Sequence, residues 1–338
     1  MPVTLAQAAV NTLNSVDFSV IDNLRRYSWL LDHMVFDDSV NPGTGGGTLT
    51  YGFTQLTSAA PADFRAINSE YTPGQAVRSR STVDLKPLGG AFNVDRVLAN
   101  LGPAATNEVT MQMQQLLTSI RIRFQQEVIL GDTSVNANGF NGLSKQLTGT
   151  STEKTAGYIA GSADWKAATV NTQALAQSRL DEVDDWLSLV VPSHTGSGDQ
   201  GAPGALPPGI KAILGNTKSI ARLKALIRWS ALTTNDKDDL GRNVAMYGDW
   251  FLIDIGDRHD GSAPIIPITS NATDLYAVSF GLDALHGVSV SGAPLTRTML
   301  PDFTIAGAVK TGECEMGPVA VVLKNTRAAA VLRSITVT

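Results

Sequence analysis

Apolar residues recur at helical spacing near the N-terminus, where two amphipathic helices are predicted. The first covers 4–14, and the second begins after Ser19 and continues to Val35. The glycine-rich stretch NPGTGGG at 41–47 then breaks regular structure. We therefore expect residues 1–45 to form an arm whose apolar faces need a surface outside the arm.

Residues 48–93 alternate between apolar and polar positions, which predicts a long two-stranded hairpin. The strands are expected in TLTYGFTQLT and QAVRSRSTVDLKPL. The segment between them, SAAPADFRAINSEYTPG, is too polar and too rich in turn residues for a core. Because an isolated hairpin is only marginally stable in water, this one is expected to lie on another surface. The sequence LGG at 88–90 predicts a tight bend after it.

The clearest helix is predicted from Pro103 or Thr106 to Gly131, because proline near the start and glycine after the end suit helix termini. Roughly 25 residues would span about 38 Å. A loop at 131–165 precedes a helix expected at 172–191, and a further loop is expected at 193–209. A short buried strand and a helix capped by Asn216 come next. Strands follow in WFLIDIG, APIIPIT, LYAVSFG and GVSVSG and in the last 40 residues.

Composition favours a chain that buries surface against other copies. Of its 338 residues, 43% are hydrophobic and only 17% are charged, against roughly 25% in ordinary soluble proteins. The net charge of −5 is spread without a strongly basic block, which excludes a dedicated nucleic-acid binder. The single cysteine, Cys314, excludes an intrachain disulfide and a thiolate zinc site. No signal peptide or membrane span is predicted.

Motifs for known chemistry fail at specific positions. The stretch GIKAILGNTKS has Asn216 where a phosphate loop needs lysine, and GVSVSG lacks the second glycine of a nucleophile elbow. The stretch from Asp132 has Ala137 and Leu143 where a calcium loop needs glycine and glutamate, so a polar turn is expected there. We predict no cofactor and no catalytic residue.

The loop DIGDRHDG carries the best alternative, since Asp254, Asp257, His259 and Asp260 could together hold a divalent metal. A solvated loop after a buried strand is the favoured interpretation. The other histidines are scattered, and each is expected at the surface or satisfied locally: His33, His194 and His286. Cys314 has no base in its segment, which argues against a catalytic thiol.

The order of the segments is more informative than any motif. An arm, a glycine hinge, an extended loop, a long helix, a compact mixed section and terminal strands follow one another. This order resembles the major capsid proteins of tailed bacteriophages, which have the Hong Kong 97-type fold. The resemblance rests on seven stretches in sequence: ADFRAINSEYTPGQAV, LKPLGGAFNVDRVLAN, NGFNGLSKQL, GIKAILGNTKSIARLKALIRWS, GRNVAMYGDWFLIDIGD, LYAVSFGLDALHGVSV and GPVAVVLKNTRAAAVLRSI.

The resemblance implies an α+β chain with four named parts. These are an N-terminal arm at 1–45, an extended loop at 46–82, a peripheral domain at 83–165 and 298–338 with a spine helix at 103–131, and an axial domain at 166–297.

The implied function is assembly. Copies would form hexamers and pentamers of an icosahedral shell around packaged double-stranded DNA, which they contact weakly and non-specifically. The implied location is the virion, assembled in the host bacterial cytoplasm, with portal and decoration proteins as further partners. An encapsulin-like protein compartment is the alternative, and a soluble metal-dependent hydrolase using DIGDRHDG is a third interpretation.

Two departures from relatives refine this expectation. Some relatives cross-link a lysine of the extended loop to an asparagine of a neighbour, but the first lysine here is Lys86, so no such bond is expected. Some also carry a scaffolding extension before the arm, and here the arm begins within a few residues of Met1, which predicts a separate scaffolding protein.

The extended loop carries charges in place of that lysine. We hypothesise that its arginines and glutamate pair with oppositely charged groups of neighbouring subunits, mainly carboxylates. The residues are Arg65, Glu70, Arg78 and Arg80. A solvated strand face is the alternative, because exposed ion pairs contribute only about 0–1 kcal/mol each.

Overall fold

A computed structural model describes most of the chain. The described residues are 28–42, 48–100, 108–159, 161, 163–191, 209–229, 234–237 and 243–338. The helix predicted at 4–14, the first half of the second predicted helix, residues 43–47 of the glycine-rich stretch and nearly all of the loop at 193–209 lie outside them. Among the described helices, none combines the length and apolar character needed to cross a membrane.

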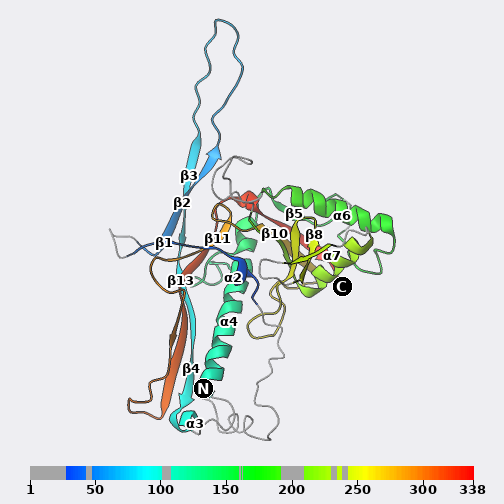
Figure 1. Ribbon diagram of the computed structural model, residues 1–338. Helices are drawn as coiled ribbons and strands as arrows, with labels where there is room; N and C mark the ends of the chain where they lie inside the picture. Colours follow the sequence, from blue (N-terminus) through cyan, green and yellow to red (C-terminus); the bar gives the residue numbers. More distant parts are fainter. Residues whose placement is uncertain are drawn as a thin grey trace.

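One half of the molecule is a five-stranded sheet beside a long helix. The strand order is β1-β11-β13-β12, and β4 pairs with β13 along the edge opposite β12. Helix α4 lies alongside the β4–β13 ribbon and packs its buried side against it (Figure 1). The elements are β1 Phe36–Val40, β4 Lys86–Asp95, α3 Arg96–Asn100, α4 Glu108–Leu130, β11 Leu285–Val290, β12 Thr296–Met299 and β13 Val309–Leu323.

The other half is a seven-stranded mixed sheet in the order β5-β14-β10-β6-β9-β8-β7. Alternate residues of β6 enter two separate cores: Ile213 packs with helices α6 and α7, and Leu214 joins the core that contains α4. The elements are β5 Glu153–Thr155, α6 Gln173–Ser188, β6 Lys211–Gly215, α7 Thr217–Trp229, β7 Thr234–Lys237, β8 Asn243–Tyr247, β9 Trp250–Asp254, β10 Ala272–Ser279 and β14 Ala329–Thr336.

The extended loop is a hairpin that projects away from both halves (Figure 1). Strands β2 (Thr50–Ser58) and β3 (Val77–Asp84) form a two-stranded sheet. The long hairpin predicted from the alternating pattern is therefore confirmed. The α+β fold class is also confirmed by the mixture of helices and sheets.

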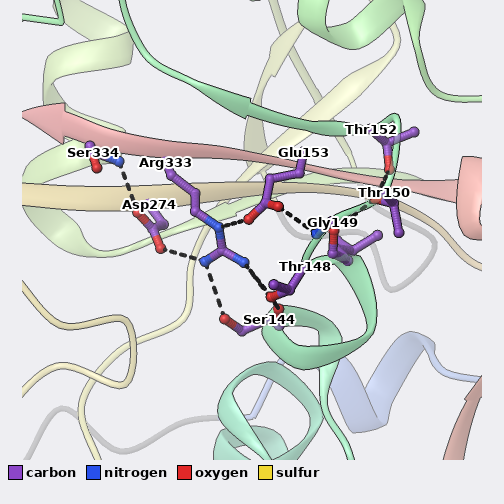
Figure 2. Close-up of polar contacts among 10 residues, drawn as sticks. Ser144, Thr148, Gly149, Thr150, Thr152, Glu153, Asp274, Arg333 and Ser334 are labelled. Atoms are coloured by element: carbon purple, nitrogen blue, oxygen red, sulfur yellow. Dashed lines mark hydrogen bonds and ion pairs between the residues drawn. The ribbon is translucent and has the colours of Figure 1, made fainter.

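The two halves share one apolar core, and the guanidinium of Arg333 on β14 adds a polar link between the seven-stranded sheet and the short helix α5, Leu143–Leu147 (Figure 2). It forms ion pairs with Glu153 on β5 and Asp274 on β10. It also donates to the carbonyl oxygen of Ser144, 3.0 Å away, in α5, which follows the long helix. One partly buried side chain thus holds α5 against the seven-stranded sheet.

The second predicted helix is wrong in its described part. Only Leu30–His33 is helical (α2), and β1 begins at Phe36. Leu30 is fully buried, and the amide of Trp29 donates to Oε1 of Gln125 in α4 at 3.0 Å. The predicted arm, 1–45, therefore does not include residues 29–40, because most of their apolar side chains are covered by the chain's own core, with Val35 as the exposed exception.

The predicted bend at 88–90 is also wrong, since β4 runs straight through it. Gly89 and Gly90 instead allow neighbouring atoms of β13 and α4 to pack closely against β4. A Cβ on Gly90 would lie 2.6 Å from Cδ1 of Leu116 in α4, and a Cβ on Gly89 would lie 2.7 Å from the carbonyl oxygen of Cys314.

The strand predicted in APIIPIT is absent from the described residues 263–269. Pro264 and Pro267 lack the amide hydrogens that a strand would use. Ile265 and Ile266 are nevertheless fully buried. Helices α6 and α7 match prediction, and Oδ1 of Asn216 accepts the amide hydrogen of Ser219 at 2.9 Å as the expected cap.

Strand pairing crosses the predicted division between peripheral and axial domains at three elements. Strand β11, predicted in the axial domain, pairs with β13 in the five-stranded sheet. Strands β5 and β14, predicted in the peripheral domain, pair with each other in the seven-stranded sheet, where β14 also pairs with β10. Backbone hydrogen bonds, which sequence position alone does not reveal, assign these strands to the opposite half. The α4 helix begins at Glu108 and ends before Gly131, as expected for the spine helix.

Candidate inter-subunit surface

The hairpin is held to the body only at its root. The hydroxyl of Tyr51 donates to Oδ2 of Asp37 at 2.9 Å, and Nε2 of Gln55 donates to the carbonyl oxygen of Lys324. Beyond these contacts, β2 and β3 pair only with each other among the described strands. Both outer edges of the hairpin therefore offer unpaired backbone groups, the arrangement to which another chain can add a strand.

The tip of the hairpin, residues 59–76, exposes large apolar side chains. Phe64 is 102% exposed, Ile67 91% and Tyr71 65%. Apolar groups of this size are normally covered, so a cluster of them on a projecting loop indicates a contact surface. This cluster was missed in the sequence, because the three apolar residues are scattered among polar and turn-forming residues.

Two of the predicted contact residues lie in this tip. Arg65 and Glu70 line a hollow of about 540 Å³. The guanidinium of Arg65 donates to the carbonyl oxygen of Ser69 at 3.0 Å and lies 5.3 Å from the centre of the Tyr71 ring. Arg65 thus shapes the tip of its own chain, and its pairing with a neighbour stays a prediction. Glu70 forms no ion pair with any described residue.

The other two predicted residues lie apart from the tip, on β3. Arg78 is opposite Leu56 and Arg80 is opposite Thr54, so all four side chains are on one side of the hairpin. We call this side the outer face: Gly52, Thr54, Leu56, Arg78, Arg80 and Thr82. All of these residues are exposed, whereas alternate residues such as Phe53 and Val83 pack towards the body. The structure therefore brings Arg78 and Arg80 together and leaves Arg65 and Glu70 separate from them.

A second exposed surface, missed in the sequence, covers the β4–β13–β12 sheet opposite helix α4. We call it the ribbon face. Glu313 and Glu315 of β13 point outwards, while Cys314 and Met316 between and beside them are buried in the core. Opposite the glutamates lie Gly89 and Ala91 of β4 and Arg297 and Met299 of β12.

The Asp254–Asp260 loop is built from turns. Oδ1 of Asp254 accepts the amide hydrogen of Gly256 at 3.0 Å, and Oδ1 of Asp260 accepts that of Ser262 at 3.1 Å. The hydrogen bonds from Ser262 lower the pKa of Asp260. Across the described ranges, no group of three or more His, Cys, Asp or Glu side chains is placed to hold a metal ion.

The loop at Asp132 is likewise a turn. Oδ1 of Asp132 accepts hydrogen bonds from the hydroxyl and amide of Ser134, which lower the pKa of Asp132 to about 2. Oδ2 pairs with the ammonium of Lys145 at 3.1 Å. The thiol of Cys314 is buried, and burial raises its pKa.

The histidines differ from expectation in one case. Nδ1 of His33 lies 3.0 Å from the carbonyl oxygen of Trp29, a locally satisfied position as predicted. His286 was expected at the surface or satisfied, which is wrong: it is fully buried, and neither ring nitrogen has a hydrogen-bond partner among the described residues. It lies in β11 under the root of the hairpin, 6.0 Å from the Tyr51 ring. His194 lies outside the described residues.

No family model matches the sequence, and no curated protein matches it. Solved structures match over almost the whole chain. The holo-SrpI encapsulin complex from Synechococcus elongatus matches 100% of this chain and 98% of its own chain, with 12% identity and a TM-score of 0.63. The capsid of the native GTA particle matches 95% of this chain and 94% of its own, with 10% identity and a TM-score of 0.62.

The capsid of Myoviridae phage XM1 matches 95% of this chain and 97% of its own, with 13% identity and a TM-score of 0.57. This chain has the Hong Kong 97-type capsid fold. The three matches extend over at least 95% of this chain. At 10–13% identity the fold is shared while individual residues are not, so each contact must be argued from this chain.

Proposed function

We propose that this chain is the major capsid protein of a tailed bacteriophage. Copies assemble into hexamers and pentamers, which close into an icosahedral shell that encloses double-stranded DNA. Two of the matched structures are capsids, one of a phage and one of a GTA particle, and this supports the proposal.

The observation that carries the proposal is the exposed tip of the hairpin. Phe64, Ile67 and Tyr71 are left in water by a single chain, at the end of a hairpin with two unpaired edges. A second copy can cover them by contact with a different part of its surface. Such head-to-tail contacts generate rings when the rotation closes. Obligate interfaces of this kind bury roughly 2,000–5,000 Å².

The proposed role is structural and not catalytic. Residues 46–82 act as the extended loop that holds neighbours together without a lysine–asparagine cross-link. The halves built on the five-stranded and seven-stranded sheets act as the peripheral and axial domains. Contact with DNA is weak and non-specific, because the net charge of −5 leaves little attraction for phosphates. The location is the virion, after assembly in the host cytoplasm. Scaffolding, portal and decoration proteins stay predicted partners.

Electron microscopy of the full-length protein, with measurement of nuclease-protected nucleic acid in particles from infected cells, tests this function. Closed icosahedral shells that protect double-stranded DNA support it. A protein that stays monomeric or dimeric at all concentrations overturns it.

An encapsulin-like compartment is the second candidate, because the encapsulin complex matches the full length of this chain. The same particles distinguish the two functions. A shell filled with protein and free of nuclease-protected DNA favours the compartment, and a DNA-filled shell favours the capsid.

A further inference from the structure

The outer face of the hairpin and the ribbon face carry opposite charges at the same spacing. Arg78 and Arg80 are two residues apart on β3, and Glu313 and Glu315 are two residues apart on β13. Side chains two apart on a strand point the same way and are separated by about 7 Å. Each arginine can therefore face one glutamate when the two strands lie over one another.

All four charges are unpaired among the described residues. Neither the arginines nor the glutamates form an ion pair with any described residue, although Arg297 lies opposite Glu315 in register. Strands β3 and β4 follow one another in a nearly straight line, with the hairpin at one end and the ribbon at the other (Figure 1). Gly89, the partner of Glu315, lies nine positions after Arg80 along an extended chain, a distance of about 30 Å. The arginines of one chain cannot reach its own glutamates.

Both faces are shaped for a flat contact. Gly89 and Ala91 beside the glutamates have almost no side chain, so the two carboxylates stand above their neighbours on the β4 side, while Arg297 and Met299 flank them on the β12 side. On the hairpin, the Arg80 guanidinium lies across Gly52, where a Cβ would be 3.0 Å from Nη2. Each face also exposes one apolar side chain next to its charges: Leu56 opposite Arg78, and Met299 opposite Glu313.

We propose that the outer face of the hairpin docks on the ribbon face of a second copy of this chain, with Arg78 against Glu313 and Arg80 against Glu315. In this register Leu56 and Met299 meet and bury each other's apolar surface. Arginine and carboxylate match in a two-pronged hydrogen-bonded geometry, which fixes the register as well as the attraction. The inference rests on the proposed function, since it names the surface that each subunit offers its neighbour in the shell.

Charge reversal in two variants tests the contact. Arg78→Glu/Arg80→Glu places acid on acid, and Glu313→Arg/Glu315→Arg places base on base. Each variant alone should need at least about tenfold more protein to assemble than the wild type. All four positions are exposed or half-buried, so circular dichroism and monomer unfolding should match the wild type.

The decisive experiment mixes the two variants. In an alternating ring every reversed hairpin meets a reversed ribbon face, so the equimolar mixture should form even-numbered rings that neither variant forms alone. The quadruple variant should restore closed shells. If the wild type assembles but neither the equimolar mixture nor the quadruple variant recovers assembly, the inference is overturned. The proposed function is unaffected by that result. Loss of DNA content with unchanged assembly in Arg78→Glu/Arg80→Glu also overturns it and assigns the arginines to nucleic-acid contact. A wild type that never assembles contradicts the proposed function itself.

Discussion

Arg333 on β14 and Glu153 on β5 form an ion pair in which both side chains are only 22% exposed. The second oxygen of Glu153 accepts the amide hydrogen of Gly149 at 2.6 Å, and a second nitrogen of Arg333 pairs with Asp274 at 3.2 Å. A single guanidinium therefore satisfies two carboxylates and the end of α5 (Figure 2). It thus links α5 to the seven-stranded sheet, in addition to the apolar core that both halves share.

Arg333→Met should destabilise the protein, because Glu153 and Asp274 would face each other without a cation. Breaking a partly buried ion pair in this way costs about 2–4 kcal/mol. Urea unfolding of the unassembled protein measures the loss. Arg327→Met, at an exposed position six residues earlier, is the matched control and should change the free energy of unfolding by less than about 0.5 kcal/mol. Equal effects of both variants would contradict the assigned role of Arg333.

Phe64→Ser/Ile67→Ser should weaken assembly and leave the fold intact, because both side chains are exposed in the single chain. Burial of each in a contact is worth about 1.5–3 kcal/mol, so the protein concentration at which assembly begins should rise at least about tenfold. Light scattering over a concentration series measures this threshold. Val135→Ser removes a valine that is 87% exposed in a different loop, and it should leave the threshold unchanged. A normal threshold in the tip variant would show that the tip stays in water in the particle.

His286 should make stability fall in mild acid. Burial lowers its pKa from 6.5 to about 4, and the charge of Lys324 acts in the same direction, while Asp37 and Asp283 act against it. Between about pH 6.5 and pH 4 the unfolded chain binds a proton that the folded chain does not. Stability is therefore fully present above this range and is lost as the pH falls, by about 3 kcal/mol in total.

His286→Phe tests this assignment, because phenylalanine does not titrate. Chemical denaturation of the unassembled protein from pH 8 to pH 4 should show a shallower decline in the variant than in the wild type. Groups that titrate in both proteins cancel in the comparison. Two parallel curves would mean that His286 contributes nothing to the pH dependence.

Mature particles should contain no covalent links between subunits, since residues 46–82 have no lysine. Boiled particles on a denaturing gel should give one band at the chain mass of 35.7 kDa. A ladder of multiples that survives reducing agent would refute this prediction.

The long elements could be predicted because their signals are local. The apolar period of α4 continues to Gly131, and the alternation in β2 and β3 is clear even though one face of the hairpin is exposed. Asn216 supplies its own cap, which marks the start of α7. In each case the residues that define the element also make the contacts that stabilise it.

The missed features depend on residues far away in sequence. Gly89 and Gly90 suggest a bend until Cys314 and Leu116 are seen to require the space. Residues 29–40 are held by Gln125 of α4 and by β11, about 90 and 250 positions away. The glutamates of the ribbon face and the burial of His286 become visible only when β13 and β11 are paired.

The central claim is that one copy leaves surface which only further copies cover. Sedimentation velocity of the purified full-length protein over a wide concentration range tests it most directly. The account predicts a 35.7 kDa species at low concentration that gives way, above a threshold, to rings and closed particles. A single 35.7 kDa species at every concentration would contradict it.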